Sequence, residues 1–166
     1  MIYQNKLFTK NECDSIIDLI KLDSMNWLYA DRSYESKLIS YNHSTKWIFD
    51  KLREFFEKET NIKITELKRE IHFHTFQKND YFGIHNDSRD NRLYSVGVIL
   101  NDSFDGGDFI LYPNNNVIQL DKTIGNAYIF PANVEHEVTK ILNGNRYSLI
   151  WFLQNSNIKL NIKSII

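Results

Sequence analysis

Three residues have side chains that are suited to holding one metal ion. His85 and Asp87 lie two positions apart, and in a β-strand such residues leave the same face. An imidazole from His136, on a distant strand, would complete a set of two histidines and one carboxylate. Such a set holds a divalent ion and leaves up to three adjacent coordination positions free. We therefore predict a metal site at His85, Asp87 and His136.

The remaining histidines and the single cysteine are weaker candidates for metal binding. A His-x-Asp pair alone is weak evidence, because chance produces such pairs in a chain of this composition. His72 and His74 are also two apart, but no carboxylate shares their spacing, so we do not expect them to be ligands. Cys13 is the only cysteine, which excludes a disulfide framework and a thiolate cluster. We expect a cytoplasmic protein, since the N-terminus lacks the pattern of a signal peptide.

Arg146 adds a second kind of chemistry. It stands within the apolar stretch that runs to Trp151, and a buried arginine is costly unless an anion meets it. A bound dicarboxylate would supply that anion, with one end on the metal and the other paired with the guanidinium. The alternative is that Arg146 lies on the exposed face of the strand, at the protein surface.

The elements that must position these residues change in type near residue 62. Beyond it, period-two patterns and short apolar runs are separated by turn residues rich in Asn, Asp and Gly. Strands are predicted at 69–76, 82–87, 92–100, 107–112, 117–120, 126–130, 135–142 and 145–153, with a ninth near 157–162. Short strands at this spacing, with no helical pattern between them, indicate a sandwich or jelly roll.

Two amphipathic helices are predicted before that region. Thr9 and Glu12 have the spacing of a capping box, and an apolar face follows from Cys13. A second helix begins after Thr45 and ends at Thr60 and Asn61, with short strands expected near 27–29 and 37–39. These helices can cover one sheet and protect its edge.

Length and charge limit the organisation and the partners. The 166 residues correspond to one domain, 1–166, in which 1–65 is mainly helical support and 66–166 is the strand core. The net charge is −1, with no stretch of one sign that could follow a phosphate backbone. We expect no nucleic-acid partner, and no apolar run is long enough for a membrane span. The sequence does not indicate an oligomeric state.

The strand region resembles the prolyl 4-hydroxylase-like branch of the iron(II)- and 2-oxoglutarate-dependent dioxygenases. The resemblance covers about half of the chain, and its elements occur in the family's order. They lie at residues 76–87, 92–101, 104–109 and 125–130, then at 136–138, 144, 146 and 151. Asp108 stands where the family usually has glutamate.

The resemblance implies a fold, cofactors and an activity. The fold is α+β, with a double-stranded β-helix (jelly roll) core and N-terminal helices packed on one sheet. His85, Asp87 and His136 would bind Fe(II), and Arg146 would pair with the 5-carboxylate of 2-oxoglutarate. An unactivated C–H bond of a prolyl residue, or of a related peptide or small amino-acid-like substrate, would be hydroxylated with release of succinate and CO2. Ascorbate is the reductant that the resemblance implies.

Departures from the family affect the cosubstrate pocket. Phe76 and Ile99 stand where members commonly carry tyrosines that help to hold 2-oxoglutarate, so two hydroxyl groups are missing. Ser95 and Ser148 are candidate substitutes, and Ser148 shares a strand face with Arg146. Phe82, Ile84, Ile129 and Trp151 are candidates for an apolar wall around the oxidant, and packing in the core is the alternative and commoner role for such residues.

Three other functions stay open at this stage. Some members of the wider superfamily dealkylate nucleic acids, but the near-neutral charge and Phe152, where a second arginine would stand, disfavour this. A cupin-like jelly roll would use its metal without oxidation, and it is distinguished by whether Arg146 points into the metal pocket. A hydrolytic zinc site would fit the three ligands but leaves Arg146 without a function.

Overall fold

The computed structural model describes residues 1–22 and 34–159, and a six-stranded antiparallel sheet is its largest element. The strand order is β1-β10-β6-β13-β4-β2. In that order the strands span Tyr3–Lys6, Asn126–Pro131, Arg92–Ile99, Arg146–Gln154, Glu70–Phe76 and Glu35–Ser40. The central strands β6 and β13 are the longest, and they carry residues to both faces of the sheet.

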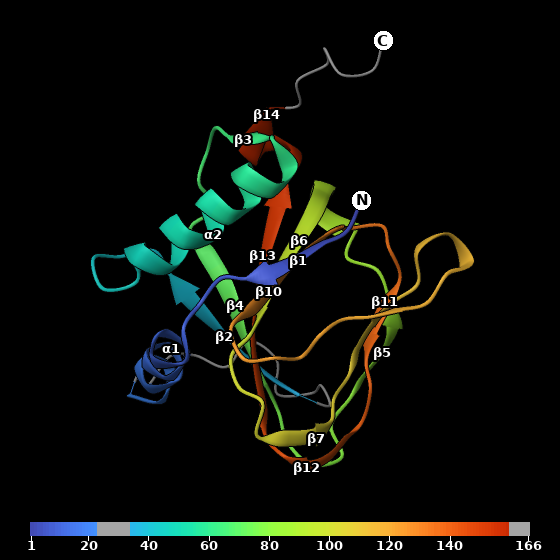
Figure 1. Cartoon of the computed structure of the whole chain (residues 1–166). Coiled ribbons are helices and arrows are strands. Elements are labelled where there is room, and N and C mark those ends of the chain that lie inside the picture. Colours follow the sequence, from blue (N-terminus) through green and yellow to red (C-terminus); the bar gives the residue numbers. More distant parts are fainter. Residues whose placement is uncertain (23–33, 160–166) are drawn as a thin grey trace.

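A second antiparallel sheet has the order β5-β11-β8-β9. Its strands span Phe82–His85, His136–Val138, Phe109–Leu111 and Ile118–Gln119. Two further pairs join β12 (Ile141–Gly144) to β7 (Phe104–Gly106) and β14 (Ile158–Lys159) to β3 (Lys63–Ile64). Short 3-10 turns lie at Arg89–Asn91, Pro113–Asn115 and Asn155–Asn157. Figure 1 shows β5 and β11 on one side of the larger sheet and both helices on the other. This is the predicted jelly-roll arrangement.

Both predicted helices form, as α1 (Lys10–Leu22) and α2 (Lys46–Thr60). The capping box is present, since the Thr9 N–H donates to Glu12 Oε2 at 2.9 Å and the Glu12 N–H donates to Thr9 Oγ1 at 3.2 Å. Asn61 ends α2 in the left-handed conformation, with φ at 57°. The apolar faces of both helices are buried in the core.

The larger sheet separates two hydrophobic clusters. Leu149 and Trp151 lie in the cluster under the helices, together with Val96 and Val98. Ile150 and residues of the smaller sheet form the other cluster. The split follows the period of two along each strand, because successive side chains leave opposite faces.

The N-terminal third contributes more strand than the pattern indicated. β1 pairs with β10 and β2 pairs with β4, so both edge strands of the larger sheet come from residues 1–65. The strand predicted near 37–39 lies within β2, whereas the one near 27–29 falls outside the described residues. The predicted strand 135–142 is divided into β11 and β12.

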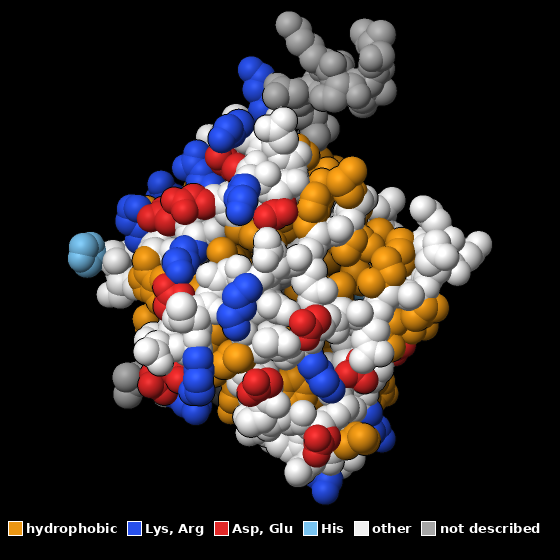
Figure 2. Space-filling model, in the orientation of Figure 1, with side chains coloured by type: hydrophobic (Ala, Val, Ile, Leu, Met, Phe, Trp, Pro, Cys, Tyr) orange, Lys and Arg blue, Asp and Glu red, His pale blue; other side chains and the backbone are white. Residues whose placement is uncertain are grey.

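Charges on the surface are mixed in sign. Figure 2 shows lysine, arginine, aspartate and glutamate side chains interspersed over the face that carries α2. Among the residues described, no helix combines the length and the apolar character that a membrane crossing requires.

Candidate metal centre

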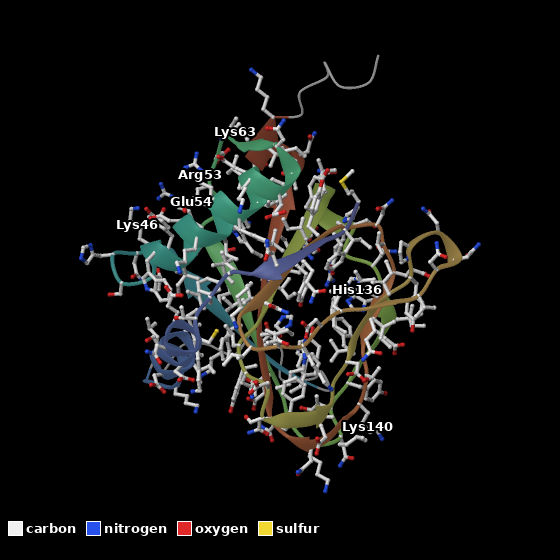
Figure 3. All side chains as sticks on the ribbon, viewed as in Figure 1. Lys46, Arg53, Glu54, Lys63, His136 and Lys140 are labelled. Carbon is white, nitrogen blue, oxygen red and sulfur yellow. The ribbon has the colours of Figure 1, made fainter. Side chains whose placement is uncertain are left out.

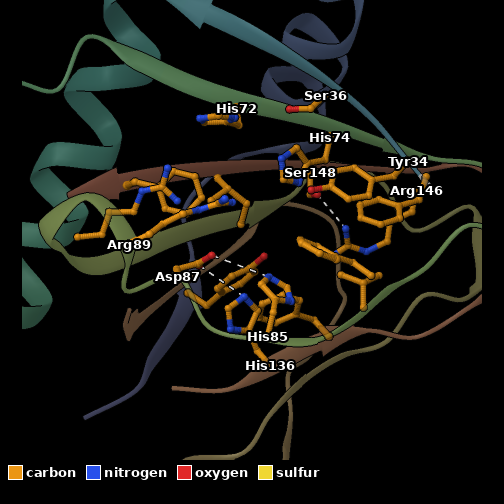
Figure 4. Close-up of a pocket in the computed structure, with 18 residues that line it drawn as sticks. Tyr34, Ser36, His72, His74, His85, Asp87, Arg89, His136, Arg146 and Ser148 are labelled. Carbon is orange, nitrogen blue, oxygen red and sulfur yellow. Dashed lines mark hydrogen bonds and ion pairs between the residues drawn. The ribbon is translucent and has the colours of Figure 1, made fainter. Parts of the chain in front are cut away.

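The structure brings His85, Asp87 and His136 together at one point. His136 Nε2 lies 3.5 Å from Asp87 Oδ2, and His85 Nε2 lies 3.9 Å from Asp87 Oδ1. One ligand atom from each residue falls within 4.8 Å of the other two, and no other group of this kind is found among the described residues. Figure 4 shows the three side chains converging.

Strand pairing produces this convergence. His136 on β11 lies directly opposite His85 on β5 in the antiparallel register. Just beyond β5, the Asp87 N–H donates to the Ala132 carbonyl at 2.7 Å, which ties this residue to the loop before β11. In Figure 3 His136 lies inside the molecule, whereas the labelled Lys46 and Lys140 stand at its periphery. Residues 51 positions apart in the chain therefore meet through backbone hydrogen bonds.

Both imidazoles are held with Nε2 free to face a metal. His85 Nδ1 lies 2.7 Å from the Gly83 carbonyl, and His136 Nδ1 lies 2.9 Å from the Val134 carbonyl. A carbonyl only accepts, so each Nδ1 must carry the proton and each Nε2 presents a lone pair. Burial, followed by the nearby His136, lowers the pKa of His85 and favours the neutral ring that a metal requires.

The carboxylate of Asp87 is also oriented by a neighbour. Asp87 is 5% exposed, and Ser95 Oγ donates to its Oδ2 at 2.6 Å. Ser95 is a candidate substitute for a hydroxyl that contacts 2-oxoglutarate, and in the structure its hydroxyl group donates to the acidic member of the triad. A carboxylate fixed in this way needs less reorganisation when it binds a cation.

Arg146 lies in the same pocket as the triad. One cavity is lined by His85, Asp87 and His136 together with Arg146. Figure 4 shows Arg146 and Ser148 across the pocket from the three convergent residues. The pocket therefore has a candidate metal site at one end and the guanidinium of Arg146 at the other. An arginine that points into the metal pocket is the feature that disfavours a cupin-like site.

The guanidinium of Arg146 is buried without an anion. Arg146 is 1% exposed, and its Nη1 donates to Ser148 Oγ at 2.8 Å. Its Nε and Nη2 have no hydrogen-bond partner, and no carboxylate among the residues described here forms an ion pair with it. Burial lowers the pKa of Arg146. A bound carboxylate would relieve the cost of these unmatched donors.

Some pocket residues differ from the sequence expectation. Phe82 lines the pocket as predicted and stacks on His85 with ring centroids 3.6 Å apart. Ile84, however, is 60% exposed, and Ile129 and Trp151 lie in the cluster under the helices. Ile129 and Trp151 therefore follow the core alternative, and Ile84 faces solvent, because their strand positions place them away from the pocket.

His72, His74 and Tyr128 line the pocket although the sequence did not indicate it. The two histidines are not part of the metal-binding group, but they share a β4 face with Phe76. Tyr128 was assigned only to a buried strand. The available signal was the period of two on β10 and β4, which places these residues on the same sheet face as Arg146.

The donor set and the pocket fit iron and a keto diacid. Two imidazole nitrogens and one carboxylate oxygen are the ligands of non-haem Fe(II) sites with open positions. The unmatched Nε and Nη2 of Arg146 match the two oxygens of a carboxylate in a bidentate pair. Phe76 and Ile99, where the resemblance placed tyrosines, contribute only apolar surface, and Phe76 lies under the guanidinium at 5.4 Å.

Comparison with known proteins agrees with this chemistry. A family model described as the 2OG-Fe(II) oxygenase superfamily matches residues 71–154, about half of the chain. The match spans all three triad residues and Arg146. No curated protein matches the chain by sequence.

Solved structures share the fold. An oxidoreductase of the 2OG-Fe(II) oxygenase family from Burkholderia pseudomallei is similar over 94% of this chain and 87% of its own, with TM-score 0.74 and 17% identity. A Pseudomonas putida prolyl-4-hydroxylase is similar over 93% of this chain and 92% of its own, with TM-score 0.73 and 18% identity. A third similar structure is a Trichoplax adhaerens prolyl hydroxylase in complex with a hypoxia inducible factor peptide. The similarity covers 92% of this chain and 83% of that chain, with TM-score 0.74 and 17% identity. The predicted family and jelly-roll fold are thus confirmed.

Proposed function

Because the chain belongs to the 2OG-Fe(II) oxygenase superfamily, we propose that it hydroxylates an unactivated C–H bond of a prolyl residue or a related amino-acid-like substrate. The reaction would consume dioxygen: one oxygen atom would enter the new hydroxyl group and the other would enter succinate as 2-oxoglutarate loses CO2. The observation that carries this proposal is a buried arginine with unmatched donors in the same pocket as a His-Asp-His cluster. The chemistry of a hydrolytic or isomerising metal site does not itself require such an arginine.

Each residue of the site has a distinct task. His85, Asp87 and His136 would hold Fe(II), with Ser95 orienting the carboxylate and two backbone carbonyls orienting the imidazoles. Arg146 would bind the 5-carboxylate of 2-oxoglutarate. Fe(II) and 2-oxoglutarate together would activate dioxygen, which is the oxidant that attack on a C–H bond requires.

The walls of the pocket protect and orient what is bound. Phe82, Phe109 and Val138 line the pocket near the triad, so apolar surface surrounds the reactive centre and limits access of water. A second, more open hollow continues past Phe82 to Tyr81 and Arg89. We assign this hollow to entry of the substrate.

The substrate class rests on the neighbours in fold. Two of the similar structures are prolyl hydroxylases, and one of them carries a peptide. We therefore propose a peptide or amino-acid-like substrate, with ascorbate as a candidate reductant. Dealkylation of nucleic acid is the weaker alternative, because Phe152 stands six positions after Arg146, where a second arginine would be expected, and the net charge is −1.

The decisive experiment is an anaerobic titration with Fe(II) and 2-oxoglutarate. Bidentate chelation of Fe(II) by 2-oxoglutarate is expected to produce a visible charge-transfer band. Asp87→Ala should abolish the band while the protein stays folded, and Asp102→Ala, which removes an exposed carboxylate, should leave it unchanged. A full band in Asp87→Ala would exclude the assigned site.

A second measurement addresses the substrate. Succinate formation is followed with proline-containing peptides, free proline and methylated oligonucleotides, each beside a reaction without substrate. Stimulation by a prolyl compound, with a gain of one oxygen atom in its mass, is the expected result. Stimulation by the oligonucleotide alone would replace the prolyl assignment with dealkylation.

A further inference from the structure

We propose that Tyr128 is a binding residue for the second carboxylate of the keto diacid, acting together with Arg146 and Ser148. This inference rests on the proposed function. It gives a role to a hydroxyl group that neither the sequence pattern nor the family match assigned. Tyr128 lies on β10, two strands away from Arg146 on β13, so only the folded sheet brings the two into one pocket.

The hydroxyl group of Tyr128 is buried without a partner. Tyr128 is 0% exposed, and its Oη makes no hydrogen bond of normal geometry, although it lies close enough to Arg146 for the guanidinium to act on its pKa. A buried phenol normally finds a partner, since an unmatched hydroxyl costs free energy. The atoms Arg146 Nε and Arg146 Nη2 are unmatched in the same pocket. These unmatched donors, which share the pocket with the equally unmatched Ser36 Oγ, indicate an acceptor that arrives from outside the chain.

Tyr128 is also suited to donate. Burial raises the pKa of Tyr128 to about 12, and the neighbouring Arg146 charge acts against that rise. The phenol therefore stays protonated at neutral pH and offers its proton to an anion. Ser148 Oγ accepts from Arg146 Nη1, so the hydroxyl proton of Ser148 is directed elsewhere and is a further donor.

Gly97 makes room for this arrangement. Gly97 on β6 lies opposite Tyr128 in the antiparallel register. A Cβ atom at this position would overlap the ring and the hydroxyl oxygen of Tyr128. On its other side the ring stacks on Phe109, with centroids 4.8 Å apart and planes at 24°. The ring is thus held over a glycine and cannot easily turn out of the pocket.

The consequence is selectivity for keto acids with a second carboxylate. Contacts made by Tyr128 to that carboxylate should strengthen binding of 2-oxoglutarate but not of 2-oxopentanoate, which has the same five carbons and the same chelating end. A charge-assisted hydrogen bond accounts for about a tenfold change in affinity or more. The difference between the two acids therefore isolates the contribution of the hydroxyl group.

The test measures dissociation constants for both acids, anaerobically with Fe(II), in the wild type, Tyr128→Phe and Tyr147→Phe. Tyr147 neighbours Arg146 on β13 but leaves the opposite face, so its variant is a matched loss of a hydroxyl group. Tyr128→Phe should weaken 2-oxoglutarate about tenfold and leave 2-oxopentanoate within about twofold. Tyr147→Phe should change neither. Gly97→Ala, which displaces the ring, should reproduce the selective loss.

Failure of this inference is distinguishable from failure of the proposed function. Tyr128→Phe with unchanged affinity for 2-oxoglutarate, or with equal losses for both acids, would overturn the role of the hydroxyl group while the site stands. A wild-type protein that binds neither acid would overturn the proposed function and this inference together.

Discussion

The two faces of the six-stranded sheet are built from the same strands but differ in composition. The helix face, defined here by Val96, Val98, Leu149 and Trp151, is fully buried and apolar. The pocket face, defined here by Ser95, Tyr128, Arg146 and Ser148, is equally buried but polar.

The two faces also differ in whether their buried polar atoms have hydrogen-bond partners. On the helix face, the indole N–H of Trp151 donates to the Lys68 carbonyl at 2.9 Å. On the pocket face, Tyr128 Oη and two nitrogens of Arg146 lack partners. Burial alone thus does not distinguish stability from function in this chain. Burial of polar groups without partners does, because their cost must be met by something that binds.

The largest expected effect is on the helix face. Trp151→Ala should lower the free energy of unfolding by about 3–5 kcal/mol, because it empties a fully buried volume next to Phe49. Urea denaturation measures the change. Phe152→Ala, one residue along and partly exposed on the pocket face, is the control and should cost clearly less. Equal losses would mean that both faces support the fold alike.

Arg146→Met tests the opposite face. The substitution removes a buried charge and keeps an unbranched apolar stem, so the ligand-free protein should gain about 1 kcal/mol in unfolding free energy. The dissociation constant for 2-oxoglutarate should rise about ten- to a hundredfold. Denaturation and anaerobic titration of one preparation give both values. A loss of stability would show that Arg146 supports the fold.

Ser95→Ala tests the support of the triad. Loss of the 2.6 Å hydrogen bond to Asp87 should weaken metal binding about tenfold with little change in unfolding free energy. Titration with Co(II) provides a direct measurement, and Ser156→Ala, at an exposed serine, is the control. If metal affinity is unchanged, Asp87 does not depend on this hydroxyl group for its orientation.

Cys13 should show the smallest effect, since it lies under the helices and away from the pocket. Burial raises the pKa of Cys13 from 9.0 to about 11, so at pH 8 only about one thiol in a thousand is ionised. Iodoacetamide should modify it only after unfolding, as mass spectrometry would show. Cys13→Ser should keep wild-type succinate formation, and a large loss would connect α1 to the pocket.

The raised pKa of Cys13 also makes the unfolding free energy depend on pH. Below pH 9 the thiol is protonated in both the folded and the unfolded chain, and its contribution is fully present. Between pH 9 and about 11 the unfolded chain releases the proton first, so stability falls as pH rises. The unfolding free energy of the wild type, compared with Cys13→Ala across that range, measures this contribution.

Local patterns in the sequence were sufficient for much of the fold. The capping box at Thr9, the end of α2 at Asn61 and the alternation along β13 depend on neighbours within a few residues, and each is present in the structure. The spacing of His85 and Asp87 was likewise readable, because a strand sets the direction of side chains two positions apart.

The pairing of strands that lie far apart in the sequence could not be predicted from local patterns. The register that sets His136 opposite His85, and the strand order that brings Tyr128 of β10 near Arg146, depend on contacts across the folded sheet. For the same reason the sequence does not show that Ser95 donates a hydrogen bond to Asp87, or that His72 and His74 line the pocket.

The sequence by itself therefore determined which residue types were available, in which elements, and on which face of each strand. Only the tertiary structure decided which faces meet and which buried polar atoms remain unmatched. The physical reason is that side-chain direction is a property of the local backbone, whereas partner choice is a property of strands joined across the whole sheet.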